Sequence, residues 1–86
     1  MFKLVFKSSI SKDIRKIDKH KLREIAQAVN SLKSNPLPES AKKIKGGNEP
    51  YYRIRQGAYR IGYRINSDIK AVEVVFIKIR NEKTYR

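Results

Sequence analysis

The sequence predicts one α+β domain over residues 1–86, in the order β-α-α-β-β-β, with two N-terminal helices packed on a small antiparallel sheet. Three observations indicate this fold. Apolar and basic residues alternate at period two through residues 51–80, as in strands with one face in a core and one in water. Apolar residues between Ile10 and Leu32 recur at spacings of three and four, as on an amphipathic helix. A chain of 86 residues suffices for one core, and it contains no recognisable linker or repeat.

The N-terminal part predicts a short strand followed by the two helices. Phe2, Leu4 and Phe6 recur at every second position, which is typical of a strand with one buried face. Serines at positions 8, 9 and 11 are interpreted as helix caps. The apolar stripe then changes phase over residues 18–20, so we expect two helices, or one sharply broken helix, over about residues 9–34.

The C-terminal part predicts three strands, over about residues 51–56, 58–66 and 69–80. Turn-forming residues separate them, and such short links indicate an antiparallel meander. Residues 74–77 are apolar at every position, which predicts a central strand covered on both faces. The prolines from Pro36 onward end the helical part, so residues up to Pro50 are expected to form a loop.

The charge of the chain predicts a polyanionic partner. Lys and Arg number 21 against 8 Asp and Glu, which gives a formal net charge of +13. So large an imbalance destabilises a compact chain by self-repulsion, and solubility requires far less charge. Nucleic acid, a ribosome or an acidic protein would balance it. Neither a signal peptide nor an apolar run of membrane-spanning length is recognisable, so we expect a cytoplasmic protein without membrane contact.

Several kinds of catalytic chemistry are excluded by composition. The chain has no cysteine, which removes disulfide and thiol chemistry. His20 is the single histidine, so a two-histidine ribonuclease mechanism is excluded, and its polar surroundings predict a solvated side chain. The acidic residues are scattered without metal-ligand spacing, so neither a metal site nor a cofactor is expected. Gly46-Gly47 is interpreted as a turn because the Gly-Lys-Ser/Thr signature of a phosphate loop is missing.

Basic residues share one face of the predicted sheet. Alternation places Arg53 and Arg55 on one side of their strand, with Arg60 and Arg64 sharing a side of the next. Lys78 would share a face with Arg80 on the last strand. If the strands form a meander, five or six of these cations converge on one surface, where opposite-strand cations repel unless an anion binds. An ordinary solvated sheet face remains the alternative interpretation.

Arginines gathered in this way suit phosphate chemistry in RNA. Cleavage by the RNA's own 2′-hydroxyl requires loss of its proton, stabilisation of a phosphorane-like dianion, and a proton for the leaving 5′-oxygen. Arginine is planar and binds phosphate with two donors at once, which suits the second requirement. It is a poor proton donor or acceptor. Metal-free catalysis by such a face would therefore depend on positioning and charge stabilisation.

These features resemble the RelE/ParE superfamily of type II toxin–antitoxin toxins, in particular its RelE-like members. The segment Gly57-Ala58-Tyr59-Arg60-Ile61-Gly62-Tyr63 matches the family's strand motif of Gly-x-Tyr-Arg, a hydrophobic residue, any residue, and Tyr. The chain's last residues, from Arg80 to Tyr85 and Arg86, resemble the family's closing basic segment ending in tyrosine. The resemblance implies an endoribonuclease (mRNA interferase) that cuts mRNA in the ribosomal A site, with a ribosome, mRNA and a cognate acidic antitoxin as partners.

The resemblance also implies roles for individual residues. Arg53 and Arg55 occupy the positions of two lysines in RelE-like members, which implies substrate binding, activation of the 2′-hydroxyl and charge stabilisation. Arg60 occupies the position of an arginine that holds the scissile phosphate. Arg80 falls near the arginine linked to leaving-group protonation, and Tyr85 matches the tyrosine that orients the substrate base. Four tyrosines before Tyr85 are instead expected in the core or in strand pairing.

The last segment departs from the family pattern. Asn81-Glu82 stands where many relatives carry His-Arg or Lys-Arg, so Arg80 and Lys83 compete for one role. Further candidates for contact with RNA or the ribosome lie in the expected loop, on the strands and at the end of the chain: Lys42, Lys43, Lys45, Arg64, Lys78, Lys83 and Arg86.

Other functions remain open at this point. One is a ParE-like inhibitor of DNA gyrase on the same fold, and another is a basic RNA-binding module without catalysis. An acidic, partly disordered antitoxin could cover the basic surface and the helix pair. Leu37 and Ile69 are candidate contacts for it, although we expect them to fill the small core.

Overall fold

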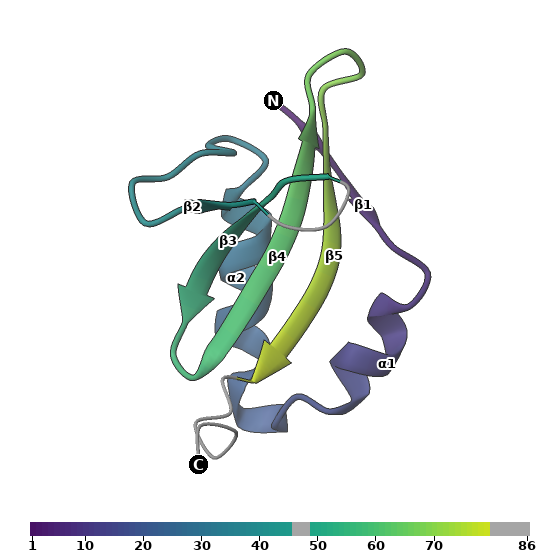
Figure 1. Ribbon diagram of the computed structural model, residues 1–86. Helices are drawn as coiled ribbons and strands as arrows, with labels where there is room; N and C mark the ends of the chain where they lie inside the picture. Colours follow the sequence, from purple (N-terminus) through teal and green to yellow (C-terminus); the bar gives the residue numbers. More distant parts are fainter. Residues whose placement is uncertain (46–48, 80–86) are drawn as a thin grey trace.

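A five-stranded sheet forms the centre of the protein (Figure 1). The computed structural model describes residues 1–45 and 49–79. The strands are β1 (Lys3–Phe6), β2 (Lys42–Ile44), β3 (Tyr51–Gln56), β4 (Tyr59–Asn66) and β5 (Ala71–Ile79), in the spatial order β1-β5-β4-β3-β2. β3, β4 and β5 form the expected antiparallel meander, and the predicted α+β class is confirmed.

Two features of the sheet differ from the sequence prediction. β1 pairs with β5 in parallel, so the sheet is mixed rather than antiparallel. The expected loop contains β2, which pairs antiparallel with β3, and the order is therefore β-α-α-β-β-β-β. β2 has three residues and two of them are lysines, so no alternation marks it in the sequence. Its extended conformation is stabilised by backbone pairing with β3, and pairing between distant segments is invisible to a local pattern.

The helical segment breaks where the apolar stripe changes phase. It comprises α1 (Ile10–Arg15), the short 3₁₀ turn η1 (Lys19–Lys21) and α2 (Leu22–Ser31). The Asp18 carboxylate accepts a hydrogen bond from the backbone N–H of His20 at 3.0 Å, which caps η1. Ser9 occupies the N-cap position of α1 but makes no side-chain capping bond there, so the expected capping role is wrong for this residue.

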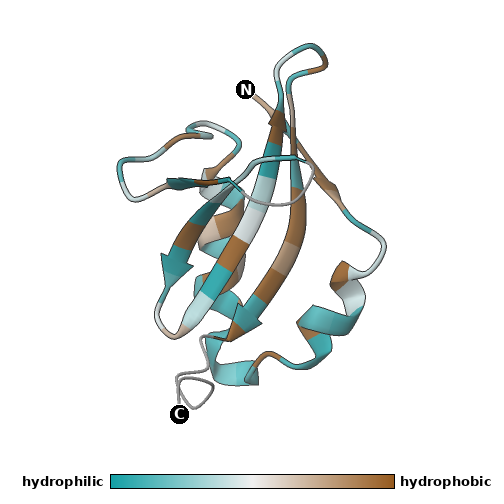
Figure 2. Cartoon of the chain, in the orientation of Figure 1, coloured by the Kyte–Doolittle hydropathy of each residue, from teal (hydrophilic) through white to brown (hydrophobic). Residues whose placement is uncertain are grey.

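The core lies between α2, parts of α1 and one face of the sheet. α2 crosses behind the strands, whereas α1 lies beside β5 (Figure 1). Hydrophobic and hydrophilic residues alternate along β3 and β4, so only one face of these strands contributes to the core (Figure 2). The buried cluster comprises Ile10, Ile17, Ile25, Val29, Leu32, Ile54, Tyr59, Ile61, Tyr63, Val72, Val74 and Ile77.

A β-bulge explains the apolar run in β5. Tyr63 pairs with Val74, whereas the preceding residue of β4 pairs with Phe76, so Val75 is the extra residue. Before the bulge the even-numbered residues of β5 face the core, and after it the odd-numbered residues do. Both Val74 and Ile77 are therefore buried. β5 is an inner strand as predicted, but Val75 and Phe76 are only half-buried. The expectation that this run is buried on both faces is thus wrong. Its residues are apolar at every position because the bulge changes which alternate residues face the core.

Three side chains outside the sheet test further expectations. His20 is exposed, as predicted. Leu37 is 53% exposed and Ile69 is 56% exposed, so the expectation that they fill the core is wrong. No helix within residues 1–45 and 49–79 is both long and apolar enough to cross a membrane.

Candidate nucleic-acid interface

The strand registers bring six cations to the face of the sheet opposite α2. Arg53 pairs with Gly62, Arg55 pairs with Arg60, and Arg60 pairs in turn with Lys78. Residues directly opposite one another in a sheet point to the same face. We call this surface the basic face, and it comprises Lys42, Arg53, Arg55, Arg60, Arg64 and Lys78.

Three of these cations form a row across the sheet. Arg55, Arg60 and Lys78 stand at matching positions of β3, β4 and β5, with Arg60 in the middle. Neighbouring side chains at such positions have Cβ atoms about 5 Å apart, and like charges at that spacing repel. An anion bound over the row would remove this repulsion, which is the electrostatic property expected of a phosphate site.

The arginines of the basic face contain polar atoms that lack partners. The Nε atoms of Arg53, Arg60 and Arg64 are buried, and none has a hydrogen-bond partner within the residues that the structure describes. The Arg64 Nε lies 3.2 Å from the Glu49 Oε1, an ion pair whose geometry is not that of an aligned hydrogen bond. Buried polar groups without partners are rare and destabilising, and bound ions are one common explanation.

Positive charge is concentrated toward one end of this face. Arg64 pairs across the strands with Glu73 and contacts Glu49, so two carboxylates offset its charge. Arg55, Arg60 and Lys78 stand opposite one another at the far end of the same strands. Among the described residues, that end therefore gathers more cations than the end at Arg64.

An aromatic pair occupies the middle of the basic face. Gly62 pairs with Phe76, and a Cβ built on Gly62 would lie 2.1 Å from a carbon of the Phe76 ring. The glycine therefore leaves the space in which this ring lies over β4. Tyr51 packs against Phe76 with the ring centroids 5.5 Å apart and the planes at 81°. Sequence reasoning missed Phe76, although a glycine inside a strand is itself a signal of close approach.

The core tyrosines contribute to stability and lie away from the basic face. Tyr59 and Tyr63 are buried, as expected. The Tyr63 hydroxyl donates to the Pro36 carbonyl at 2.6 Å, and the Tyr59 hydroxyl accepts from the Asp18 N–H at 3.0 Å. Burial, together with the neighbouring Tyr52, raises the pKa of Tyr63 to about 12. Both hydroxyls are therefore committed to the fold.

Several predicted residues lie elsewhere. Lys43 pairs with Tyr52 and projects to the face opposite the arginines, because alternate residues of a strand point to opposite sides. The structure thus separates it from Lys42. Lys45 is exposed just beyond the end of β2. Four candidates at the end of the chain lie outside the described residues: Arg80, Lys83, Tyr85 and Arg86.

The residue types on the basic face limit its chemistry. Residues 1–45 and 49–79 contain no cluster of three or more His, Cys, Asp or Glu side chains able to hold a metal ion. His20 belongs to η1 rather than to the strands of the basic face. Guanidinium and ammonium groups can grip a phosphate and stabilise developing negative charge there.

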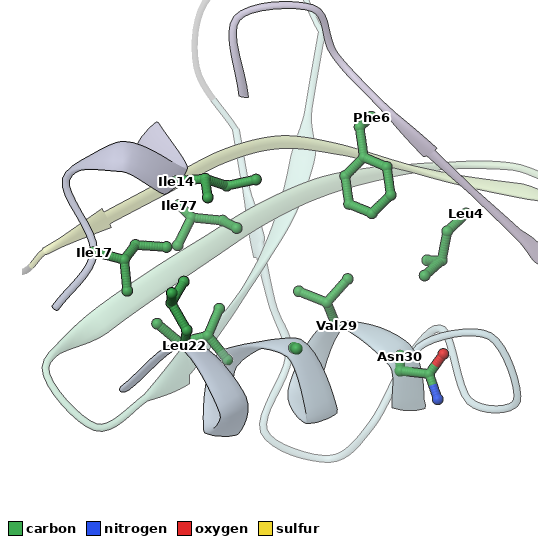
Figure 3. A pocket seen from close by; sticks show the side chains of 10 residues that line it. Leu4, Phe6, Ile14, Ile17, Leu22, Val29, Asn30 and Ile77 are labelled. Atoms are coloured by element: carbon green, nitrogen blue, oxygen red, sulfur yellow. The ribbon is translucent and has the colours of Figure 1, made fainter. Parts of the chain in front are cut away.

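An apolar groove lies on the helix side of the molecule (Figure 3). Leu4 and Phe6 of β1 face Leu22 and Val29 of α2 across it, and Ile14 of α1 lines the same groove. Its volume is about 240 Å³. Phe6 is 48% exposed and Ile14 is 41% exposed, so the groove presents apolar side chains to solvent. Exposed apolar surface of this kind marks sites of protein interaction.

Comparison with known proteins covers nearly the whole chain. Residues 4–84 match the family model described as the ParE toxin of the type II toxin–antitoxin system parDE. The chain is 34% identical to Toxin RelE3 of Methanocaldococcus jannaschii, over 95% of this chain and 92% of that protein.

Solved structures agree on the fold. A chain of the archaeal RelE–RelB complex from Pyrococcus horikoshii superposes with a TM-score of 0.79 at 22% identity, covering 94% of this chain and 97% of that one. A chain of the RelB–RelE antitoxin–toxin complex from Methanococcus jannaschii gives a TM-score of 0.69 at 28% identity, covering 94% of each chain.

Proposed function

Because the chain belongs to the RelE/ParE superfamily of type II toxin–antitoxin toxins, we propose that it is a ribosome-dependent endoribonuclease that cuts mRNA in the A site and so inhibits translation. The observation that carries this proposal is the row of Arg55, Arg60 and Lys78, with Arg53 beside it on the same face. A row of cations suits the passage of an RNA backbone.

In the proposed reaction the 2′-oxygen of the RNA attacks the adjacent phosphorus and the P–O5′ bond breaks. The products are a 2′,3′-cyclic phosphate and a 5′-hydroxyl, and the proton lost at the 2′-oxygen is balanced by the proton gained at the 5′-oxygen. Arg60 holds the non-bridging oxygens, since it lies in the middle of the row. Arg53 and Arg55 bind the strand beside it and favour the ionised 2′-oxygen through their charge.

The end of the chain completes this proposed site. Arg80, or Lys83 in its place, protonates the leaving oxygen, and Tyr85 orients the base, in keeping with the family pattern. Arg80 immediately follows β5, the strand that carries Lys78. Lys42, Lys45, Arg64 and Arg86 provide additional contacts to phosphates.

Dependence on the ribosome follows from the residue types. Arginine transfers protons poorly at neutral pH, so such a site gains most of its rate from positioning and charge. A substrate held in one geometry by a ribosome supplies the positioning that a free RNA lacks. Cleavage of loose RNA should therefore be slow.

A cognate antitoxin is the proposed regulatory partner. Chains similar in fold belong to toxin–antitoxin complexes from Pyrococcus horikoshii and Methanococcus jannaschii. An acidic antitoxin segment would neutralise the basic face, and apolar side chains of the same partner would fit the groove lined by Phe6 and Ile14. Because charge contributes to this association, added salt should weaken it.

Primer extension on programmed ribosomes tests the proposed activity. The purified chain should produce a cut at the A-site codon and little cleavage of the same mRNA without ribosomes. Arg60→Ala should abolish the cut, whereas Arg23→Ala, which removes the same charge from an exposed position on α2, should not. The absence of a cut with the unmodified protein would refute the endonuclease.

A second candidate is favoured by the family model, whose description is the ParE toxin. On that interpretation the chain would inhibit DNA gyrase, and the basic face would dock a protein or DNA. Incubating gyrase, supercoiled DNA and the purified chain decides this point. Trapped DNA-cleavage complexes, together with intact mRNA on ribosomes, would support the gyrase inhibitor.

A further inference from the structure

A hollow lies between α1 and the sheet, next to the basic face. Its volume is about 460 Å³, within the range of pockets that hold small ligands. The loop before α1, α1 itself and the sheet contribute five cations to its lining: Lys7, Lys12, Lys16, Arg64 and Lys78. Lys78 also ends the row formed with Arg55 and Arg60, so the hollow continues the basic face toward α1.

The floor of the hollow is the face of an aromatic ring. The three atoms nearest to a Cβ built on Gly62 would be adjacent ring carbons of Phe76, at 2.1, 2.4 and 2.6 Å. Such similar distances to three neighbouring carbons mean that the ring turns its face, and not its edge, toward β4. Its other face is therefore directed away from the sheet, and Phe76 lines the hollow.

The ring of Tyr51 packs perpendicular to that of Phe76, with the ring centroids 5.5 Å apart. Its plane stands at 81° to that of Phe76, and Tyr51 also lines the hollow. A flat aromatic group in the hollow would therefore meet two perpendicular aromatic rings. Base stacking on aromatic side chains is a general device for binding single-stranded nucleic acid.

The position of α1 is set by a hydrogen bond to the sheet. The Asp13 Oδ2 accepts from the backbone N–H of Ile77 at 3.0 Å. β1 pairs with β5 only as far as Val74, so Asp13 bonds the edge of β5 beyond the end of β1. The single carboxylate among the residues lining the hollow is thus engaged with the backbone. Lys12 of α1 and Lys16, the residue that follows the helix, lie about one turn apart, and both line the hollow.

We propose that this hollow binds one nucleotide of single-stranded RNA, with its base stacked on Phe76 and its phosphate held between Lys12, Lys16 and Lys78. The inference rests on the proposed function, because it extends the RNA that crosses the basic face by one position. An acidic peptide could use the cations, but it has no need of aromatic rings. The combination of two aromatic rings and several cations in the lining therefore favours a nucleotide.

Binding of a short fluorescent RNA at low salt, without ribosomes, tests this site separately from cleavage. Phe76→Leu keeps an apolar side chain over Gly62 but removes the ring, and it should weaken binding about tenfold. In a series of RNAs that each lack one base, a single abasic position should weaken binding by a similar factor. At that position Phe76→Leu should cause no further loss, because the base and the ring form one interaction.

The lysines of α1 provide an independent readout. The double variant Lys12→Ala/Lys16→Ala should lower the slope of log affinity against log salt by roughly 1.4, at about 0.7 for each charge removed from the RNA backbone. Lys19→Ala/Lys21→Ala removes the same charge from exposed positions in η1 and should leave the slope nearly unchanged. This comparison remains decisive even if Phe76→Leu fails to fold, which thermal unfolding would report.

The outcomes separate this site from the proposed function. The nucleotide site is overturned if no abasic position weakens RNA binding. It is also overturned if the two double variants give equal slopes of log affinity against log salt, even when A-site cleavage persists. Binding that depends on Phe76 and on one base supports the site, even if no mRNA is cut on ribosomes. Competition by polyglutamate combined with a flat abasic scan would identify the hollow as a docking site for an acidic protein.

Discussion

The two faces of β4 show how one strand serves both stability and binding. On the face toward α2, Tyr59, Ile61 and Tyr63 are each at most 6% exposed, and both tyrosine hydroxyls are hydrogen-bonded. On the other face, Arg60 and Arg64 flank Gly62, and their buried Nε atoms lack hydrogen-bond partners within the described part of the chain. The core face thus hydrogen-bonds its tyrosine hydroxyls within the fold, whereas the other face carries guanidinium groups whose Nε atoms are not hydrogen-bonded within the described residues. Substitutions on the two faces should therefore change different quantities.

The largest effect on stability is expected at Ile61, which is fully buried at the centre of the core face. Ile61→Ala should lower the free energy of unfolding by about 4 kcal/mol, because it removes buried apolar surface and leaves a cavity. Urea denaturation followed by circular dichroism measures this loss. The folded fraction should still bind RNA with unchanged affinity. A large loss of affinity per folded molecule would show that the two faces are coupled.

The largest effect on activity is expected at Arg60. Arg60→Ala should slow A-site cleavage about 100-fold or more, the cost typical of removing one donor to a developing negative charge. Arg60→Lys should recover only part of the rate, because lysine keeps the charge but not the two-donor geometry. Single-turnover cleavage on ribosomes gives the rates. A stability loss in Arg60→Ala similar to that of Ile61→Ala would contradict the division between the faces.

Substitution of Gly62 should affect both stability and RNA binding. In Gly62→Ala the new Cβ would meet the Phe76 ring at 2.1 Å, so the ring must move. We expect a loss of about 2 kcal/mol in the free energy of unfolding from overpacking, together with weaker RNA binding. Adding Phe76→Leu should restore part of the stability but not the binding. Additive effects of the two substitutions on stability would rule out this contact as the cause.

The smallest effect concerns the response of the core face to pH. Tyr63 has a pKa of about 12 in the folded protein, above its ordinary value of 10.0, so the folded state retains a proton that the unfolded chain loses. This contribution is fully present below pH 10 and declines as pH rises toward 12, by about 1 kcal/mol between pH 10 and 11. In Tyr63→Phe that part of the alkaline loss should vanish. Thermal unfolding of both proteins across this range measures the difference.

Much of the fold follows from local pattern. The meander of β3, β4 and β5 and the broken helix were predictable, because alternation and helical spacing act over a few residues. β2 was not predictable, since three residues carry too little pattern and owe their conformation to pairing with β3. The parallel pairing of β1 with β5 likewise joins segments about 70 residues apart. The exposure of Leu37 and Ile69 also depends on tertiary packing.

The candidate site likewise has a part that the sequence predicted and a part that it did not. Arg53, Arg55, Arg60 and Arg64 could be assigned to one face from the sequence, and the registers confirm that these residues lie together. Lys43 was expected in a loop, and the pairing of β2 with β3 instead directs it to the face opposite these arginines. Phe76 and the lysines of α1 were missed altogether. Their proximity depends on a bulge in β5 and on the packing of α1, neither of which has a short-range signal.

The sequence by itself determined which side chains share a face of each strand, since neighbouring residues of a strand must point to opposite sides. It also determined the net charge of +13, which favours an anionic partner. Only the tertiary structure decided which cations stand opposite one another and which aromatic ring lies over Gly62. It also placed α1 beside this face, through a hydrogen bond between Asp13 and Ile77, 64 residues apart. Such placements arise from contacts between distant segments, because local backbone geometry leaves the register and the packing of those segments undetermined.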